Sequence, residues 1–339
     1  MAENLTAQQR ATLFAMATRQ NMQMLAKQTV TSTPNTVQFT LPKARLLAGL
    51  YVRIKATFPT GAVSMGPGSD IHRMHKLVRR VSLDLNNGFA PFVVSGRECA
   101  FYNMIDVNTK NIVEQWLTHT ELSSGEESVY VFNYHLPVTT NKRDPIGLIL
   151  LQNDQTNVTL SIDLGLASEF GATAEPTKVE VSVMAETFSI PANANAYPDL
   201  SVLKLVNGRK DSLPTEGQQV IKLATGTIYR KLAFYLTDED GNAMTPEDIT
   251  SNIELVFNQA DINYSISAEM LRELNAKDFG CYLPNGLYVF DFSAGGSFSN
   301  MGGTRDFIDS ANLTEFWLRF NTTKKGKCEI VTETLARLS

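Results

Sequence analysis

The chain has 339 residues, of which 30 are basic and 35 acidic, and its formal net charge is −5. At roughly 150 residues per domain, this length predicts two domains. The 43% hydrophobic and 19% charged fractions argue against a disordered or membrane-spanning chain and indicate a globular one. The acidic balance also argues against a dedicated nucleic-acid binder, so we expect no sequence-specific nucleic-acid partner.

The three cysteines, Cys99, Cys281 and Cys328, are too few and too odd in number to form a disulfide framework. None lies in a Cys-x-x-Cys pair, so the sequence has no zinc-ribbon motif. It also has no run of about 18 apolar residues and no signal-peptide pattern. We therefore expect reduced thiols in a protein that is made in a cytoplasm.

Residues 1–28 contain no Gly or Pro and are predicted to form one amphipathic helix that starts with a capping box at Thr6. At 100° per residue its apolar side chains fall on two stripes. Such a helix either packs on its own domain or docks on a neighbouring subunit or a membrane surface, and residues 29–34 then act as a tether. The predicted interface residues, for assembly or for contact with a membrane, are Leu13, Phe14, Met22, Met24 and Leu25.

From residue 35 the hydrophobic period changes from 3.6 to 2, which indicates β-strands separated by turn residues. A Pro- and Ala/Asn-rich stretch, residues 191–205, is predicted to be a linker. The two remaining parts, 35–190 and 206–339, each have the length of an eight-stranded jelly roll. The predicted fold is therefore all-β, with two tandem jelly rolls. The short helices expected between the strands are Asn111–Leu117, Ala268–Asn275 and one around Thr304–Ser310.

The two halves also resemble each other in sequence. A shift of 182 residues places Leu41, Leu46, Leu50, Val52 and Ile54 on Leu223, Ile228, Leu232, Phe234 and Leu236. Both final strands carry a Glu-Thr pair, at Glu186 and at Glu333, and the pattern aligns the starts of the strands before them, Asn157-Val158-Thr159 and Asn312-Leu313-Thr314. This pattern indicates a duplicated β-domain.

No motif in the chain predicts catalysis. Walker A, dinucleotide-binding and Gly-x-Ser-x-Gly patterns are missing from the sequence. His72 and His75 have a spacing that a metal can use, but the neighbouring basic residues oppose a cation. The acidic loop that begins at Asp238 is better explained as a hairpin turn, followed by a capped helical turn at Thr245, than as a calcium site. We therefore predict no catalytic residue, no metal and no cofactor.

A basic run in the first half is the main charge asymmetry. Nucleic acid or anionic lipid would attract such a run. The total charge is acidic, however, so we favour a subunit interface whose acidic side lies in the other half. The run consists of Lys43, Arg45, Arg53, Lys55, Arg73, Lys76, Arg79 and Arg80.

The chain resembles the double jelly-roll major capsid proteins of tailless icosahedral viruses, the tectivirus-like lineage that includes adenovirus hexon. The stretch Val37–Phe58 resembles the opening strand pair of that family, Leu283–Phe292 resembles a late strand, and Thr304–Glu315 resembles the short helix and strand that follow. The likeness covers almost the whole chain as a pattern rather than a strict motif.

The resemblance implies a non-enzymatic major capsid protein that is located in the virion. It implies a homotrimer whose six jelly rolls form a pseudo-hexagonal capsomer, with neighbouring capsomers and minor or penton proteins as partners and an internal membrane as a further candidate. Two rival functions stay open: a glycan-processing amidase built on two jelly rolls, and a carbohydrate-binding module.

Overall fold

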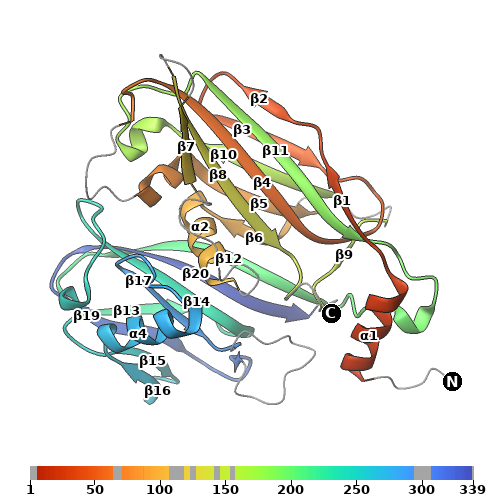
Figure 1. Ribbon diagram of the computed structural model, residues 1–339. Coiled ribbons are helices and arrows are strands. Elements are labelled where there is room, and N and C mark those ends of the chain that lie inside the picture. The colour runs from red at the N-terminus through yellow and green to blue at the C-terminus, as the bar shows by residue number, and fades with distance from the viewer. Residues whose placement is uncertain are drawn as a thin grey trace.

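A computed structural model describes residues 6–63, 71–86, 88–106, 118–122, 127–140, 146–152, 157–293 and 307–337. Two β-sandwiches lie side by side, and helix α1 (Ala7–Ala17) lies at one end of the first (Figure 1). We call the sandwiches the first and second roll. Their interiors form two large hydrophobic cores, one for each roll.

The first roll has two sheets. One has the strand order β1-β11-β4-β8-β7, and the other contributes β6-β5-β10-β3 to a longer sheet. The short strands β2 and β9 also belong to the first of these sheets, where β2 pairs with β11 and β9 pairs with β4. The bounds are β1 Gln20–Met24, β2 Gln28–Val30, β3 Asn35–Thr40, β4 Leu46–Pro59, β5 Val78–Leu85, β6 Phe89–Val94, α2 Gly96–Ile105, β7 Thr118–Leu122, β8 Glu127–Pro137, β9 Ile149–Leu150, β10 Val158–Leu164 and β11 Lys178–Phe188.

The second roll is built in the same way. Its sheets have the orders β17-β14-β20-β12 and β13-β19-β15-β16. The bounds are β12 Val202–Leu213, β13 Gly217–Leu223, β14 Ile228–Asp238, β15 Ile253–Phe257, β16 Asp261–Ile266, α4 Ala268–Phe279, β17 Leu287–Asp291, β18 Ile308–Asp309, β19 Phe316–Thr322 and β20 Gly326–Arg337. Short 3₁₀ helices occur at η1 Ile71–Leu77, η3 Ala167–Phe170, η4 Ala194–Ala196 and η5 Pro246–Asp248.

The strand orders show that the chain is a duplication, as the sequence predicts. The order β3-β10-β5-β6 of the first roll repeats as β13-β19-β15-β16 of the second, and β1-β11-β4-β8 repeats as β12-β20-β14-β17. Glu186 pairs with Gly49, and Glu333 pairs with Lys231, which is the position that the shift of 182 predicts. A β-bulge follows at the same place in both rolls.

The two helices that follow β6 and β16 also correspond. Ser95 caps α2 by accepting from the N–H of Glu98, and Ser267 caps α4 by accepting from the N–H of Met270. Counted from these caps, Asn103 and Asn275 occupy the same position. Each amide bonds both backbone groups of one residue on the facing strand, so equivalent positions can be assigned residue by residue.

The rolls are joined by a continuous sheet. Strand β12 of the second roll pairs in parallel with β6 of the first, with Val206 opposite Phe92 and Asn207 opposite Val93. The resulting nine-stranded sheet runs through both rolls from β17 to β3 (Figure 1). Helix α2 lies over this junction and packs against β20. The junction is thus a lateral, head-to-tail contact between two copies of one fold.

Several sequence predictions were wrong in detail. The predicted single helix over residues 1–28 ends at Ala17, and residues 20–24 and 28–30 are strands β1 and β2. Strand β12 begins at Val202, inside the predicted linker. Of the helix expected around Thr304–Ser310, the structure describes residues 307–310, and these contain strand β18 over Ile308–Asp309. Asn111–Leu117 lies outside the described residues.

The match of Asn157 with Asn312 was also wrong, by three residues. Leu160 pairs with Phe39, and Leu318 pairs with Ile221. The shift of 182 makes Ile221 the equivalent of Phe39. Leu160 and Leu318 are therefore equivalent. Helix α2 and strand β16 were missed.

Candidate assembly surfaces

Helix α1 packs on its own chain through the buried Phe14. The capping box predicted at Thr6 is present, since its Oγ1 accepts from the N–H of Gln9 and the Gln9 side chain accepts from the N–H of Thr6. Phe14 is buried against Phe188, with ring centroids 5.5 Å apart in an edge-to-face arrangement. Leu46, Ala48 and Leu148 complete this small cluster.

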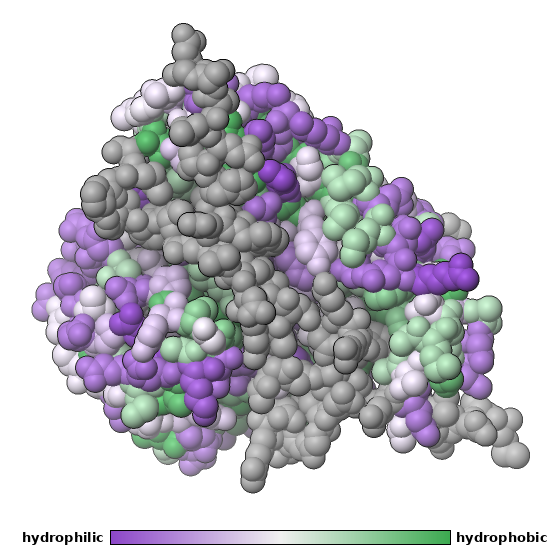
Figure 2. All heavy atoms as spheres, in the orientation of Figure 1, coloured by the Kyte–Doolittle hydropathy of each residue, from purple (hydrophilic) through white to green (hydrophobic). Residues whose placement is uncertain are grey.

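The other four predicted interface residues lie in different environments. Met22 and Met24 lie on β1, the edge strand beside β11, and their side chains are 54% and 60% exposed. Leu13 is half-buried on α1, and Leu25 is half-buried against the core of the first roll. Figure 2 shows hydrophobic side chains over α1 and the adjoining part of the first roll. The interface role of all five stays a prediction.

A second apolar surface lies on the second roll, and sequence reasoning missed it. Strand β16 is exposed along its length except at Ile266, which is half-buried, and it forms the edge of its sheet. The neighbouring helix α4 buries one side and leaves the other open. The exposed large hydrophobic residues of this surface are Ile262, Tyr264, Met270, Leu274 and Tyr282. The alternation of Ile262, Tyr264 and Ile266 is the signal that could have revealed the strand.

The junction between the rolls is rich in buried charges. Arg97 on α2 donates from Nε to Glu329 on β20 at 2.9 Å, and its Nη2 donates to the other oxygen of that carboxylate. Such a bidentate pair is stronger and more directional than a single charged contact. The Lys210 ammonium lies 3.3 Å from the Glu329 carboxylate. Burial alone raises the pKa of Glu329, but these cations hold it below its ordinary value.

Glu333 is the centre of a second buried group. It accepts from Tyr102 Oη at 2.6 Å and from Arg230 Nε at 2.8 Å, and Lys204 donates to the same tyrosine at 3.1 Å. Burial raises the pKa of Glu333, but the charges of Lys204, Lys231 and Arg230 outweigh burial and keep it well below its ordinary value. Because these side chains are enclosed and mutually bonded, the group is suited to fixing the two rolls together.

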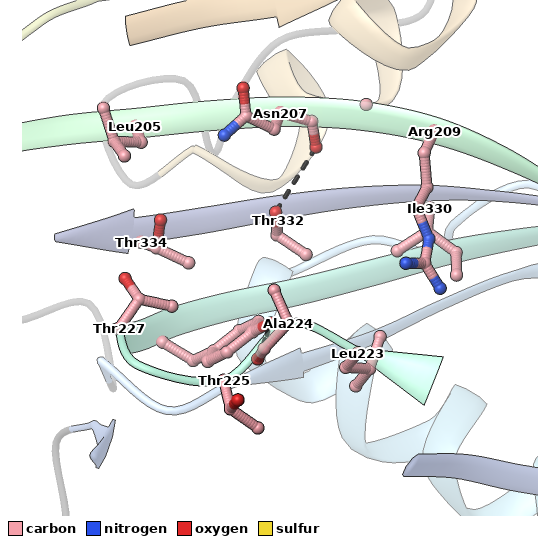
Figure 3. Close-up of a pocket in the computed structure, with 12 residues that line it drawn as sticks. Leu205, Asn207, Arg209, Leu223, Ala224, Thr225, Thr227, Ile330, Thr332 and Thr334 are labelled. Atoms are coloured by element: carbon pink, nitrogen blue, oxygen red, sulfur yellow. Dashed lines mark hydrogen bonds between the residues drawn. The ribbon is translucent and has the colours of Figure 1, made fainter. Parts of the chain in front are cut away.

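A surface pocket of about 310 Å³ opens between β12, β20 and the turn before β14 (Figure 3). Thr332 Oγ1 donates to the Asn207 carbonyl on its wall. Tyr229 Oη donates to the Ala224 carbonyl at 2.7 Å, and burial raises the pKa of Tyr229 to about 12. No Asp, Glu, His or Cys is found among the described residues that line it. It therefore lacks the acid pair that a glycan-processing enzyme needs.

The candidate metal sites of the sequence take structural roles. His75 Nδ1 lies 2.7 Å from Tyr134 Oη inside the first roll, and the imidazoles of His72 and His75 stack at 5.9 Å. Asp238 and Asn242 close the predicted hairpin turn, and Thr245 caps the predicted helical turn. Within the described ranges, no three metal-binding side chains come together. Nor does any described helix have the length and hydropathy needed to cross a membrane.

No family model matches the sequence, and no curated protein is significantly similar to it. Solved structures are similar over nearly the whole chain. The major capsid protein of STIV superposes with a TM-score of 0.69 at 14% identity, covering 94% of this chain and 97% of that one. VP54 of PBCV-1 superposes with a TM-score of 0.67 at 11% identity, covering 95% of this chain and 95% of that one. The major capsid protein P2 of bacteriophage PM2 superposes with a TM-score of 0.60 at 12% identity, covering 95% of this chain and 98% of that one. The chain therefore has the double jelly-roll fold of these viral major capsid proteins.

Proposed function

We propose that this chain is a viral major capsid protein, a structural and non-enzymatic component of an icosahedral virion. The shared fold supports this, because similar capsid proteins match it from end to end with little length left over on either side. The observation that carries the proposal is the junction between the rolls. It joins two copies of one fold head to tail through a continuous sheet and a buried charge network.

In this proposal the protein assembles as a homotrimer. A head-to-tail contact closes into a ring when its rotation allows, and three chains supply six rolls. The six rolls would form a pseudo-hexagonal capsomer that contacts neighbouring capsomers and minor or penton proteins. Helix α1 would contact neighbouring capsomers or an internal membrane beneath the shell, since β1 and β2 belong to the sheet of the first roll.

The rival functions have less support. A glycan-processing amidase needs an acid or base group in an accessible cleft, whereas the described lining of the pocket in Figure 3 has Arg209 as its charged side chain and no carboxylate, imidazole or thiol. A carbohydrate-binding module needs an exposed aromatic platform. Among the described residues of the second roll, the exposed aromatic residues Tyr264 and Tyr282 accompany an open strand edge instead, which suits contact with another chain.

Negative-stain electron microscopy of the purified protein tests the proposal. The expected images show particles with a hexagonal outline, which form arrays or shells as the protein concentration rises. Isolated particles with the dimensions of a single two-roll chain at all concentrations would contradict it.

A further inference from the structure

The duplication shows which surfaces of the rolls are used within the chain and which are left open. Within the chain, β6 of the first roll binds β12 of the second, and α2 covers the outer face of β14 and β20. Strand β16 is the copy of β6, and β1 is the copy of β12. Both β16 and β1 lie at the ends of their sheets in the part of the chain that the structure describes.

We propose that the surface formed by β16 and α4 of one protomer binds the surface formed by β1, β11 and β4 of a second protomer. The geometry is that of the junction between the rolls, where β6 and α2 bind β12, β20 and β14. This inference rests on the trimeric capsomer proposed above and specifies its subunit interface. The occupant of the open β16 edge is thus a second copy of this chain. The existing junction supplies the template, since the same two kinds of surface already bind each other once within each chain.

The register of this contact follows from the equivalent positions. Met22 pairs with Glu186 as Val206 pairs with Glu333, so Met22 is the copy of Val206. On the other surface Leu83 and Leu255 are equivalent, because they pair with the equivalent residues Leu160 and Leu318. Tyr264 pairs with Leu255 as Phe92 pairs with Leu83, so Tyr264 is the copy of Phe92. Because Val206 lies opposite Phe92, Met22 of one protomer lies opposite Tyr264 of the next.

This register brings together side chains that are otherwise poorly placed in water. Met22 is 54% exposed and Tyr264 is 37% exposed, although both are large and apolar. On α4 the exposed Met270 and Leu274 are the copies of Glu98 and Tyr102, which are buried in the junction. The contact would therefore cover most of the exposed apolar residues of both edges, as expected of an interface core.

The charges of the two surfaces are complementary at the same positions. In the junction the Arg97 guanidinium lies 5.0 Å from the centre of the Tyr235 ring, and the Phe101 ring lies 4.6 Å from it. The shift of 182 makes Arg53 the copy of Tyr235. Arg97 and Phe101 are the second and sixth residues of α2, and their copies on α4 are Glu269 and Glu273.

The contact therefore places the exposed Arg53 of one protomer between Glu269 and Glu273 of the next, all of which are exposed in the isolated chain. A cation between two carboxylates favours this pairing and this orientation. Arg53, one member of the basic run, and the two acidic residues of α4 would then lie on opposite sides of one interface.

Cysteine cross-linking tests the register. Cys281 is exposed and is first replaced by serine, whereas Cys99 and Cys328 are buried and stay. In this background Met22→Cys with Tyr264→Cys should form covalent trimers on mild oxidation, resolved by denaturing electrophoresis without reductant. The matched control is Met22→Cys with Val220→Cys, which is also exposed but lies on β13. It should give less than a tenth of the covalent trimer.

Charge reversal tests the same contact without a covalent bond. Arg53→Glu alone, and Glu269→Arg with Glu273→Arg, should each weaken trimer association at least tenfold, and the three changes together should restore it to within about threefold of the wild type. If the wild type is a trimer but the Met22→Cys, Tyr264→Cys variant gives no cross-link and the triple charge reversal gives no rescue, this subunit interface is wrong while the proposed function stands. A wild-type monomer would overturn the proposed function as well.

Discussion

Arg230 and Glu333 form a salt bridge in which the Nε–Oε1 distance is 2.8 Å and the side chains are only 1% and 2% exposed. Arg230 is the residue that the register skips at the bulge of β14, and the bulge of the first roll skips its copy, Ala48. The duplication thus kept the backbone irregularity, and the second roll uses it to direct an arginine into the junction.

Glu333→Gln should lower the free energy of unfolding by about 3–5 kcal/mol, because it leaves Arg230, Lys204 and Lys231 buried with less negative charge to balance them. Urea unfolding followed by fluorescence measures the change. The matched control is Glu186→Gln at the equivalent place, where Gln20 is the partner, and there the loss should be about 1 kcal/mol or less. Equal losses in the two variants would contradict a special role for the junction.

Acid should weaken the junction. The pKa values of Glu329 and Glu333 lie below their ordinary value of ~4.3, so their contribution to stability is complete above about pH 5 and is lost as the pH falls through the folded-state values. Glu98 works in the opposite direction, because burial raises its pKa. Unfolding free energies measured from pH 7 to about pH 2.5 should fall less steeply below about pH 5 for Glu329→Gln than for the wild type. Parallel curves would contradict this prediction.

The two buried asparagines should each contribute to their own roll. Asn103→Ala removes the two hydrogen bonds between the Asn103 amide and the N–H and C=O of His135, and Asn275→Ala removes the same two bonds to Val289. Each change should cost about 2–4 kcal/mol. The sites lie in different rolls, so the double variant should lose roughly the sum of the two. Calorimetry of the three variants checks this, and a loss below 1 kcal/mol for either single variant would contradict the assignment.

Phe14 should anchor helix α1. Phe14→Ala removes the contact with Phe188 and should release the helix while the rolls stay folded. Limited trypsin digestion should then cleave after Arg10 and Arg19 at least tenfold faster than in the wild type. Met16→Ala is the control, because Met16 is 80% exposed on the same helix. Equal cleavage rates in the two variants would show that α1 is held by other contacts.

The sequence was informative where side chains alternate. The alternating pattern predicts strands over residues 158–164 and 179–188, and the structure has β10 over Val158–Leu164 and β11 over Lys178–Phe188, because each buries every second residue along most of its length. The first helix was predicted too long, because Met22 and Met24 also fall on helical stripes. Their spacing of two residues is equally that of a strand, and the pairing with β11 decides between the two.

Other features depend on partners that are distant in sequence. Strand β12 contains Lys204, Arg209 and Asp211, and it is a strand because β20 and β6 pair with it on both sides. Helix α2 is buried nearly all round and so has no amphipathic pattern. The partner of Arg97 lies in the other roll, at the end of the chain. The candidate interface appeared only when the strand register showed which positions the duplication makes equivalent.

The mass of the native protein tests the central claim most directly. Native mass spectrometry of the full chain at micromolar concentration should give one main species at three times 37.5 kDa, the mass of a single chain. A main species of 37.5 kDa under these conditions would contradict assembly into a trimeric capsomer.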